Sequence, residues 1–294
     1  FLVDLYRLTG FNFLSFGNVL MILIGMLLVW LAVAKGFEPL LLVPIGFGVI
    51  VGNMPFDPNE LLSVYATNEH GQPEGTFAIL YFLVAHEVLP PLIFLGIGAM
   101  TDFGFMISSP RLILLGAAAQ GGVFLTFFGA ILLSFVIPGI DQISVEAASA
   151  IAIIGGADGP TSIYQANRMA PEWMGAIAIA AYSYMSLVPV IQPPVMRWLT
   201  TPEERKIRMA PPRQVSRRAR IMFPVIGFAI CTLLIPSAMP LLGMLFFGNL
   251  LRESGVTERL ARTVSGPFID SCTVILGFCV GLATTAEKFL DPAV

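Results

Sequence analysis

The sequence predicts an all-α polytopic membrane protein with several transmembrane helices, some interrupted or re-entrant, as in transporters built from inverted repeats. Its composition is 56% hydrophobic and only 12% charged, whereas a soluble domain is nearer a quarter charged. The mean hydropathy is +0.83. The 28 glycines and 22 prolines are typical of membrane helices that pack closely and break at defined points. Roughly six or seven segments are long and apolar enough to cross a bilayer.

The N-terminal part contains one clean span and one irregular one. Gly17 to Ala34 is an uninterrupted apolar run, long enough to cross a bilayer. Pro39 to Gly52 is shorter and holds Pro44, so we expect a broken or tilted helix. Residues 53–75 are polar and contain three prolines, which predicts an external loop.

The next segments alternate between interrupted and continuous helix. Thr76 to Met100 is apolar but carries His86, Glu87 and a Pro-Pro pair, which predicts an interruption. Arg111 to Ile137 is a long span. Residues 138–144 form a short turn, and a broken segment around Asp158 follows.

The remaining segments surround one strongly hydrophilic stretch. Spans are predicted at Trp173 to Gln192, at Ile221 to Leu242 (with breaks at Pro236 and Pro240) and, more weakly, at Asp270 to Ala286. The segment from Arg252 to Arg262 is expected to lie at the membrane surface. Residues 197–220 hold eight of the 16 Lys and Arg residues, which predicts a cytoplasmic basic loop. This loop either sets only the topology or also docks an acidic cytosolic partner.

The most informative residue is Asp158, because a carboxylate at membrane depth costs roughly 2.5–3.5 kcal/mol on insertion scales. Gly-Gly before it and Gly-Pro after it break the helix. Broken helices at this depth survive where their free backbone groups line a cavity or are buried in protein. Exposed carbonyls beside a carboxylate form the kind of oxygen site that binds Na⁺ in transporters. The alternative is that Asp158 caps a re-entrant turn and binds nothing.

Other polar side chains lie close to Asp158 in the sequence. Thr161 and Ser162 offer hydroxyl oxygens suited to Na⁺, or they serve only as caps of the next helix. Tyr182 and Ser186 share a helix face by their spacing, and Tyr184 points elsewhere. A tyrosine in an apolar helix is either a proton donor or a hydrogen-bonded packing residue.

Other kinds of site are not indicated. The three cysteines lie in apolar runs without metal-site spacing. The sequence contains no P-loop, Rossmann fingerprint, zinc motif or nucleophile elbow. Energy for uphill transport would therefore come from another gradient or from chemistry on partner subunits.

Several long motifs together resemble a known family. The segment Gly-Gly-Ala-Asp-Gly-Pro-Thr-Ser-Ile at 155–163 is followed by Ala-Tyr-Ser-Tyr-Met at 181–185 and Val-Pro-Val-Ile-Gln-Pro-Pro at 188–194, and further matching stretches are 37–48, 92–104 and 247–256. The chain resembles, from about Gly17 on, the membrane β subunit of the sodium-pumping, biotin-dependent decarboxylases. Members of that family act on oxaloacetate, methylmalonyl-CoA, glutaconyl-CoA or malonate.

The resemblance implies a function and a set of partners. A biotin-carrying, carboxyltransferase α subunit would load CO₂ onto biotin. The β subunit would then decarboxylate carboxybiotin, export Na⁺ and consume a proton in the inner (cytoplasmic) membrane, beside a small membrane γ subunit. Asp158 would handle Na⁺ and protons, and Tyr184 matches the family's tyrosine near the carboxybiotin chemistry. Activity would require the partner subunits.

The resemblance also sets an expectation for the extent of the domain. We expect residues 1–294 to form a single, incomplete membrane domain that lacks the family's C-terminal half-repeat. Two other functions remain open: a Na⁺- or H⁺-coupled secondary carrier of an organic anion, and a membrane anchor for a soluble complex. A carrier would work alone in vesicles, and an anchor would not need Asp158.

Overall fold

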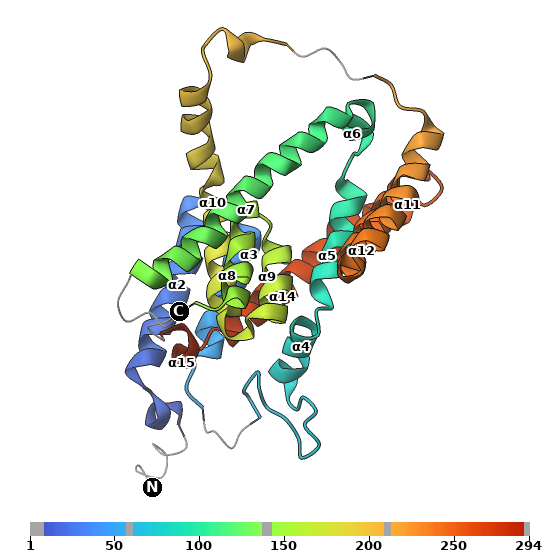
Figure 1. Cartoon of the computed structure of the whole chain (residues 1–294). Helices are drawn as coiled ribbons and strands as arrows, with labels where there is room; N and C mark the ends of the chain where they lie inside the picture. The colour runs from blue at the N-terminus through green and yellow to red at the C-terminus, as the bar shows by residue number, and fades with distance from the viewer. Residues whose placement is uncertain (1–8, 57–60, 137–142, 209–212, 291–294) are drawn as a thin grey trace.

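The computed structural model describes residues 9–56, 61–136, 143–208 and 213–290, and these residues form helices joined by turns and loops (Figure 1). Within these ranges the only extended pairing is an isolated bridge between Thr67 and Pro73. The main helices are α2 (Phe16–Lys35), α3 (Pro39–Gly52), α4 (Thr76–Ala85), α5 (Leu89–Met100), α6 (Gly104–Ser108), α7 (Ile113–Val136), α8 (Val145–Ala152), α9 (Gly159–Met169), α10 (Met174–Leu199), α11 (Arg217–Leu234), α12 (Met239–Glu253), α13 (Glu258–Thr263), α14 (Ile269–Ala283) and α15 (Ala286–Phe289).

The lengths and apolarity of these helices confirm the prediction of an all-α membrane protein. Three helices in the described part of the chain are long and apolar enough to cross a membrane: Phe16–Lys35, Pro110–Val136 and Glu258–Ala283. Two bent helix pairs raise the number to five if each pair is one span. One of them, Thr76–Ala85 with Leu89–Met100, is bent by 62°, which confirms the predicted interruption.

The start and end of α2 follow directly from its local sequence. The side chain of Ser15 accepts a hydrogen bond from Asn18 N, and the Asn18 side chain accepts one from Ser15 N, which is a capping-box arrangement. Gly36 ends the helix in the left-handed conformation with φ of 70°. The apolar run predicted from Gly17 to Ala34 is therefore confirmed.

One predicted span is divided into two helices, and the division falls where its prolines predicted a break. Ile221 to Leu242 does not form a single crossing, because α11 ends at Leu234 and the short turn η6 (Pro236–Ala238) leads into α12. Proline is favoured in the first turn of a helix, where its missing N–H costs nothing. Pro236 and Pro240 therefore begin helical segments, and α11 and α12 form a hairpin.

The boundaries of the hydrophilic stretch at 197–220 also differ from the prediction. Helix α10 continues to Leu199, and α11 already begins at Arg217. Ser216 caps α11 by accepting a hydrogen bond from Ala219 N, so polar residues at both ends of this stretch extend the helices. Asp270 to Ala286, predicted as a weak span, is the second half of one continuous helical segment, Glu258–Ala283, which includes the π-helical turn η7 (Val264–Phe268).

Two close helix crossings organise the molecule, α3 on α14 and α5 on α12. Both rely on glycines whose missing Cβ lets the backbones touch. In each crossing, a Cβ added to a glycine would clash with a carbonyl oxygen of the facing helix. Between α3 and α14 the distances are 2.3 Å from Gly48 to the Phe278 oxygen and 2.2 Å from Gly281 to the Ile45 oxygen. Between α5 and α12 they are 2.0 Å from Gly248 to the Leu95 oxygen and 1.9 Å from Gly98 to the Leu245 oxygen. The contact residues of α12 are those of α3 plus 200 (Leu245 for Ile45, Gly248 for Gly48). Those of α14 are those of α5 plus 183 (Phe278 for Leu95, Gly281 for Gly98).

Similar hydrogen bonds lie at the ends of these crossings; Thr101 and Thr284 keep the offset between α5 and α14, whereas Asn53 and Asn249 differ by one helical turn from the offset between α3 and α12. The carbonyl of Thr101 accepts a hydrogen bond from the side chain of Asn249, and the carbonyl of Thr284 accepts one from Asn53, both at 2.8 Å. Each threonine hydroxyl donates to the carbonyl four residues earlier, at 2.7 and 2.8 Å. Both asparagines are fully buried, so each crossing ends on a buried amide.

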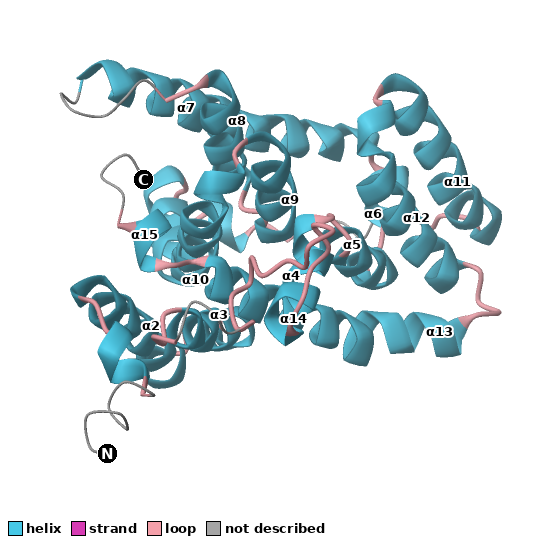
Figure 2. Cartoon of the chain, turned by 90° about the horizontal axis from the view of Figure 1, so that it is seen from below, coloured by secondary structure: helices cyan, strands magenta, loops and turns pink. Residues whose placement is uncertain are grey.

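These contacts describe two related halves that exchange a helix. The hairpin α2–α3 is followed by α5, and the hairpin α11–α12 is followed by α14. Yet α5 packs on α12, and α14 packs on α3. The two hairpins begin at opposite ends of the molecule (Figure 1), as the predicted inverted repeat requires. Seen from below, α13–α14 run between the group containing α2 and α3 and the group containing α11 and α12 (Figure 2).

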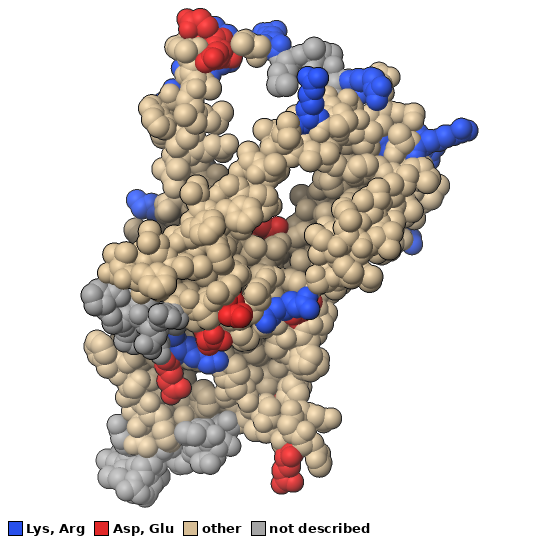
Figure 3. Space-filling view, in the orientation of Figure 1, with Lys and Arg blue, Asp and Glu red and all other residues tan. Residues whose placement is uncertain are grey.

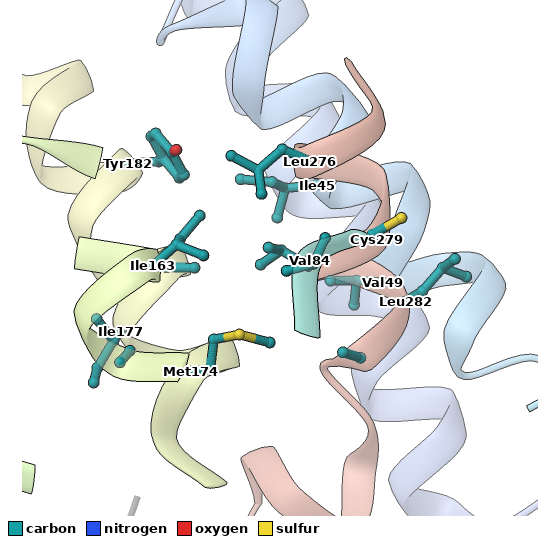
Figure 4. Packing of buried hydrophobic residues seen from close by; sticks show 14 of the residues in the cluster. Ile45, Val49, Val84, Ile163, Met174, Ile177, Tyr182, Leu276, Cys279 and Leu282 are labelled. Atoms are coloured by element: carbon teal, nitrogen blue, oxygen red, sulfur yellow. The ribbon is translucent and has the colours of Figure 1, made fainter. Parts of the chain in front are cut away.

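The largest hydrophobic cluster lies between this framework and the segment that carries Asp158. Ile45 of α3 and Leu276 of α14 stand on one side, and Ile163 of α9 and Tyr182 of α10 stand on the other (Figure 4). All four side chains are almost completely buried. The core therefore fixes α9 and α10 against the crossing of α3 and α14.

Candidate functional site

The chain around Asp158 breaks into three short pieces. Helix α8 is followed by the 3₁₀ turn η3 (Ile153–Gly156), and Ala157 adopts the left-handed conformation with φ of 54° before α9 begins. A Cβ on Gly155 would lie 2.5 Å from the Gly122 carbonyl oxygen of α7. The glycines thus let the break, defined here as residues 153–158, rest directly on the backbone of α7.

Asp158 is the N-cap of α9. Its Oδ1 accepts a hydrogen bond from Thr161 N at 3.1 Å, and its Oδ2 accepts one from the Thr161 hydroxyl at 2.8 Å. The Ser162 hydroxyl donates to the Asp158 carbonyl oxygen at 2.7 Å. The three residues predicted as a Na⁺ site therefore lie together, and the capping role considered for them is present as well.

The arrangement leaves oxygen positions for a cation. A carboxylate offers about four acceptor positions, and Asp158 uses two of them on Thr161. The hydroxyl oxygens of Thr161 and Ser162 donate their protons within the turn and keep lone pairs. Na⁺ prefers such hard oxygen ligands, so the residues fit the ion, and their assignment as its ligands stays a prediction.

The tyrosine nearest to this site is Tyr182. Its side chain is 0% exposed, and a Cβ on Gly159 would lie 2.2 Å from its ring, so this glycine makes room for the phenol beside the break. The Tyr182 hydroxyl is within electrostatic reach of Asp158 and of Glu38. Tyr184, two residues later, is 41% exposed and lies on another face of α10. Its predicted role near the carboxybiotin chemistry stays a prediction, and the side chain of Ser186 lies outside the described residues.

Glu38 was not expected at this site. It connects α2 to α3 and has a φ of 34°, a left-handed conformation that is uncommon for a residue with a Cβ. The sequence offers one signal, a glutamate between two apolar helices and directly before a proline. Its nearness to Tyr182 depends on how α3 packs beside α10.

The charges of the molecule are unevenly distributed. Lys and Arg side chains gather at the end where α11 begins and where the connection from α10 passes (Figure 3). The Asp158 break lies between α8 and α9, away from this basic end (Figure 1).

Comparison with known proteins gives one consistent result. A family model described as the Na⁺-transporting oxaloacetate decarboxylase beta subunit matches residues 17–294. The chain is 47% identical to the methylmalonyl-CoA decarboxylase subunit beta of Propionigenium modestum, over 98% of this chain and 75% of that protein. It is 45% identical to the oxaloacetate decarboxylase beta chain of Klebsiella pneumoniae, over 96% of this chain and 75% of that protein.

A third relative is named for another substrate. The glutaconyl-CoA decarboxylase subunit beta of Acidaminococcus fermentans is 49% identical, over 96% of this chain and 70% of that protein. Proteins named for three different substrates are thus similar to this chain to nearly the same degree. From the match over nearly its whole length and these identities, the chain belongs to the family of membrane β subunits of the Na⁺-transporting decarboxylases.

Proposed function

We propose that this β subunit exports Na⁺ through the break at Asp158 while carboxybiotin, carried by a partner subunit, is decarboxylated and a proton is consumed. Coupling of a decarboxylation to Na⁺ transport is the activity of its family. The observation that carries the proposal is the geometry of Asp158: a partly buried, helix-capping carboxylate at a helix break, with acceptor positions to spare and two hydroxyls beside it.

Exchange of Na⁺ for a proton on one carboxylate would provide the coupling. Ionised Asp158 holds Na⁺, and protonated Asp158 releases it, so proton uptake and Na⁺ release become the same event. Moving one charge against 100 mV costs about 2.3 kcal/mol. Decarboxylation of carboxybiotin would supply this energy by favouring one of two conformations, each with a different affinity for the ion.

The partners would be a biotin-carrying carboxyltransferase α subunit and a small membrane γ subunit, with the complex in the inner (cytoplasmic) membrane. The basic stretch at 197–220 would lie in the cytoplasm, following the bias of Lys and Arg toward that side. There it is placed to meet a cytosolic carboxyltransferase. The choice of acid or acyl-CoA then belongs to the carboxyltransferase, because biotin delivers the same carboxyl group whatever its source.

The test is the variant Asp158→Asn in the assembled decarboxylase complex in proteoliposomes. Asparagine is as good a helix N-cap as aspartate, so the fold is expected to persist while the charge is lost. We expect Na⁺-dependent decarboxylation of carboxybiotin and Na⁺ transport to be abolished. The matched control is Glu146→Gln, which neutralises an exposed carboxylate in the first turn of α8 and should leave both activities intact. Normal activation by Na⁺ in Asp158→Asn would disprove the proposal.

A further inference from the structure

Helix α9 joins the Asp158 break to the second irregular place in the fold, the bend between α4 and α5. We define this α4–α5 bend as residues 86–88, where the two helices meet at 62°. Within it Glu87 has a φ of 58°, a left-handed conformation that is sparsely populated by residues with a Cβ. Such strained positions persist only where the surrounding structure holds them.

The contacts that hold the bend come from the last turns of α9. The Asn167 side chain donates to the carbonyl oxygen of Ala85 at 2.9 Å, which satisfies a backbone group at the end of α4. Arg168 Nε lies 3.7 Å from Glu87 Oε1. The same guanidinium donates to the Tyr164 hydroxyl at 3.0 Å and lies over its ring. Tyr164 is only 3% exposed, so Arg168 is fixed on α9 by a buried side chain.

The two ends of α9 therefore serve two irregular segments. Its first residue follows the cap Asp158, and its last turns hold the bend. The helix has 11 residues and is about 16 Å long, so Glu87 is too far from Asp158 to share an ion with it. A helix of this length moves as one body, so a change of the cap at one end displaces the contacts at the other.

The related half of the molecule carries a carboxylate in the same place. Asp270 of α14 corresponds to Glu87 by the offset that pairs Gly98 with Gly281. The π-helical turn η7 directly precedes it. A carboxylate close to an irregular turn is thus a feature of both halves.

We propose that Glu87 and Arg168 are positioning residues that couple the occupancy of Asp158 to the α4–α5 bend. This inference rests on the proposed role of Asp158 as the Na⁺ site. The side chains of Glu87 and Arg168 are 26% and 45% exposed, and ion pairs as accessible as this one contribute little to stability. The effect of breaking the pair should therefore appear in the response to Na⁺ and only weakly in the thermal stability.

The experiment compares Glu87→Gln, Arg168→Gln and the double variant in the complete decarboxylase complex. The measured quantities are the Na⁺ concentration for half-maximal activation, the turnover number at saturating Na⁺ and the melting temperature. We expect each single variant to raise the half-activating concentration by at least about fivefold, the lower end of typical coupling between sites. The double variant should match the singles, because both remove the same interaction. Arg168→Lys, which keeps the charge, should restore part of the response.

A matched control pair is available on α13. Arg262 and Glu258 form a shorter and more exposed ion pair, 3.0 Å apart, away from α9. Their Gln variants should leave Na⁺ activation unchanged. A second variant, Asn167→Ala, removes only the hydrogen bond to Ala85 and should raise the half-activating Na⁺ concentration in the same direction.

Two results would overturn the inference. One is half-activation within twofold of the unmodified complex in all of the α9 and Glu87 variants. The other is a simple addition of the two single effects in the double variant. Asp158→Asn, measured in parallel, separates the two proposals. If it abolishes Na⁺ activation while the Glu87 and Arg168 variants behave normally, only the positioning role fails; if Asp158→Asn itself responds normally, the Na⁺ site fails.

Discussion

Asp158 has one role that the structure shows and a second that we propose. As an N-cap it binds the backbone of α9 through Thr161, and its remaining acceptor positions are the basis for the proposed Na⁺ site. Ser or Asn would serve as a cap at lower cost in a membrane. The expense of a carboxylate at this position is consistent with a functional role beyond capping.

Tyr182, which lies beside the Asp158 break, and Tyr184, on another face of α10, are expected to respond differently to loss of the hydroxyl. Tyr184→Phe keeps the ring and should lower turnover by more than tenfold, about 1.4 kcal/mol of barrier, with a smaller change in Na⁺ affinity. The reason is that a phenol can deliver a proton only when a hydrogen-bonded chain resupplies it. Turnover and Na⁺ activation across pH 6–8 measure both effects.

Tyr182→Phe provides the comparison. Its ring lies on Gly159 and its hydroxyl is near Asp158, so we expect it to change Na⁺ activation more than turnover. If Tyr184→Phe turns over normally over the whole pH range, Tyr184 is a packing residue and the proton takes another route.

At the scale of the helices, the two glycine crossings stabilise the fold. Membrane helices associate through close packing, because lipid is as apolar as their side chains. The contacts of Gly98 on α12 and of Gly281 on α3 are equivalent, and both leave no room for a methyl group. The two crossings are therefore expected to tolerate substitution equally badly.

Gly98→Ala and Gly281→Ala should each destabilise the protein by roughly 1–3 kcal/mol, the usual cost of overpacking a close contact. A thermal unfolding experiment on the purified protein in detergent measures the effect. The control is Gly116→Ala on α7, where a Cβ would meet nothing within 4 Å; it should be neutral or slightly stabilising, because alanine favours helix more than glycine does. Equal melting temperatures for all three variants would show that these crossings do not limit stability.

At the scale of the whole molecule, the two hairpins determine which loops share a side of the membrane. The connection from α10 to α11 lies at the basic end, and the loop between α3 and α4 lies at the opposite end (Figures 1 and 3). The positive-inside rule predicts that the basic end is cytoplasmic and that the loop between α3 and α4 is external.

Single cysteines can test this topology. In a background lacking Cys231, Cys272 and Cys279, we expect Gln214→Cys to be protected from an impermeant thiol reagent added to intact cells, whereas Glu69→Cys should react. Both residues are exposed, and neither caps a helix, unlike Ser216. After the cells are opened, Gln214→Cys should react as well. Labelling of Gln214→Cys from outside would reverse the orientation.

The sequence by itself determined the class of the protein, its family and much of its local structure. Apolar run length, capping residues and glycines act over a few neighbouring residues, so α2 and the interruptions near Glu87 and Asp158 were predictable. The juxtaposition of Asp158, Thr161 and Ser162 also followed, because one turn of helix brings them together.

Only the tertiary structure decided which helices pair. The exchange of α5 and α14 between the halves depends on backbone contacts between residues far apart in the chain, and these contacts require only a few glycines at matching positions. Few identities therefore survive between the halves, and the repeat is not visible in the sequence. The same reason explains Tyr182 and Glu38: the approach of Tyr182 to Asp158, and of Glu38 to Tyr182, follows from how α3, α9 and α10 pack around the common core, which no local pattern encodes.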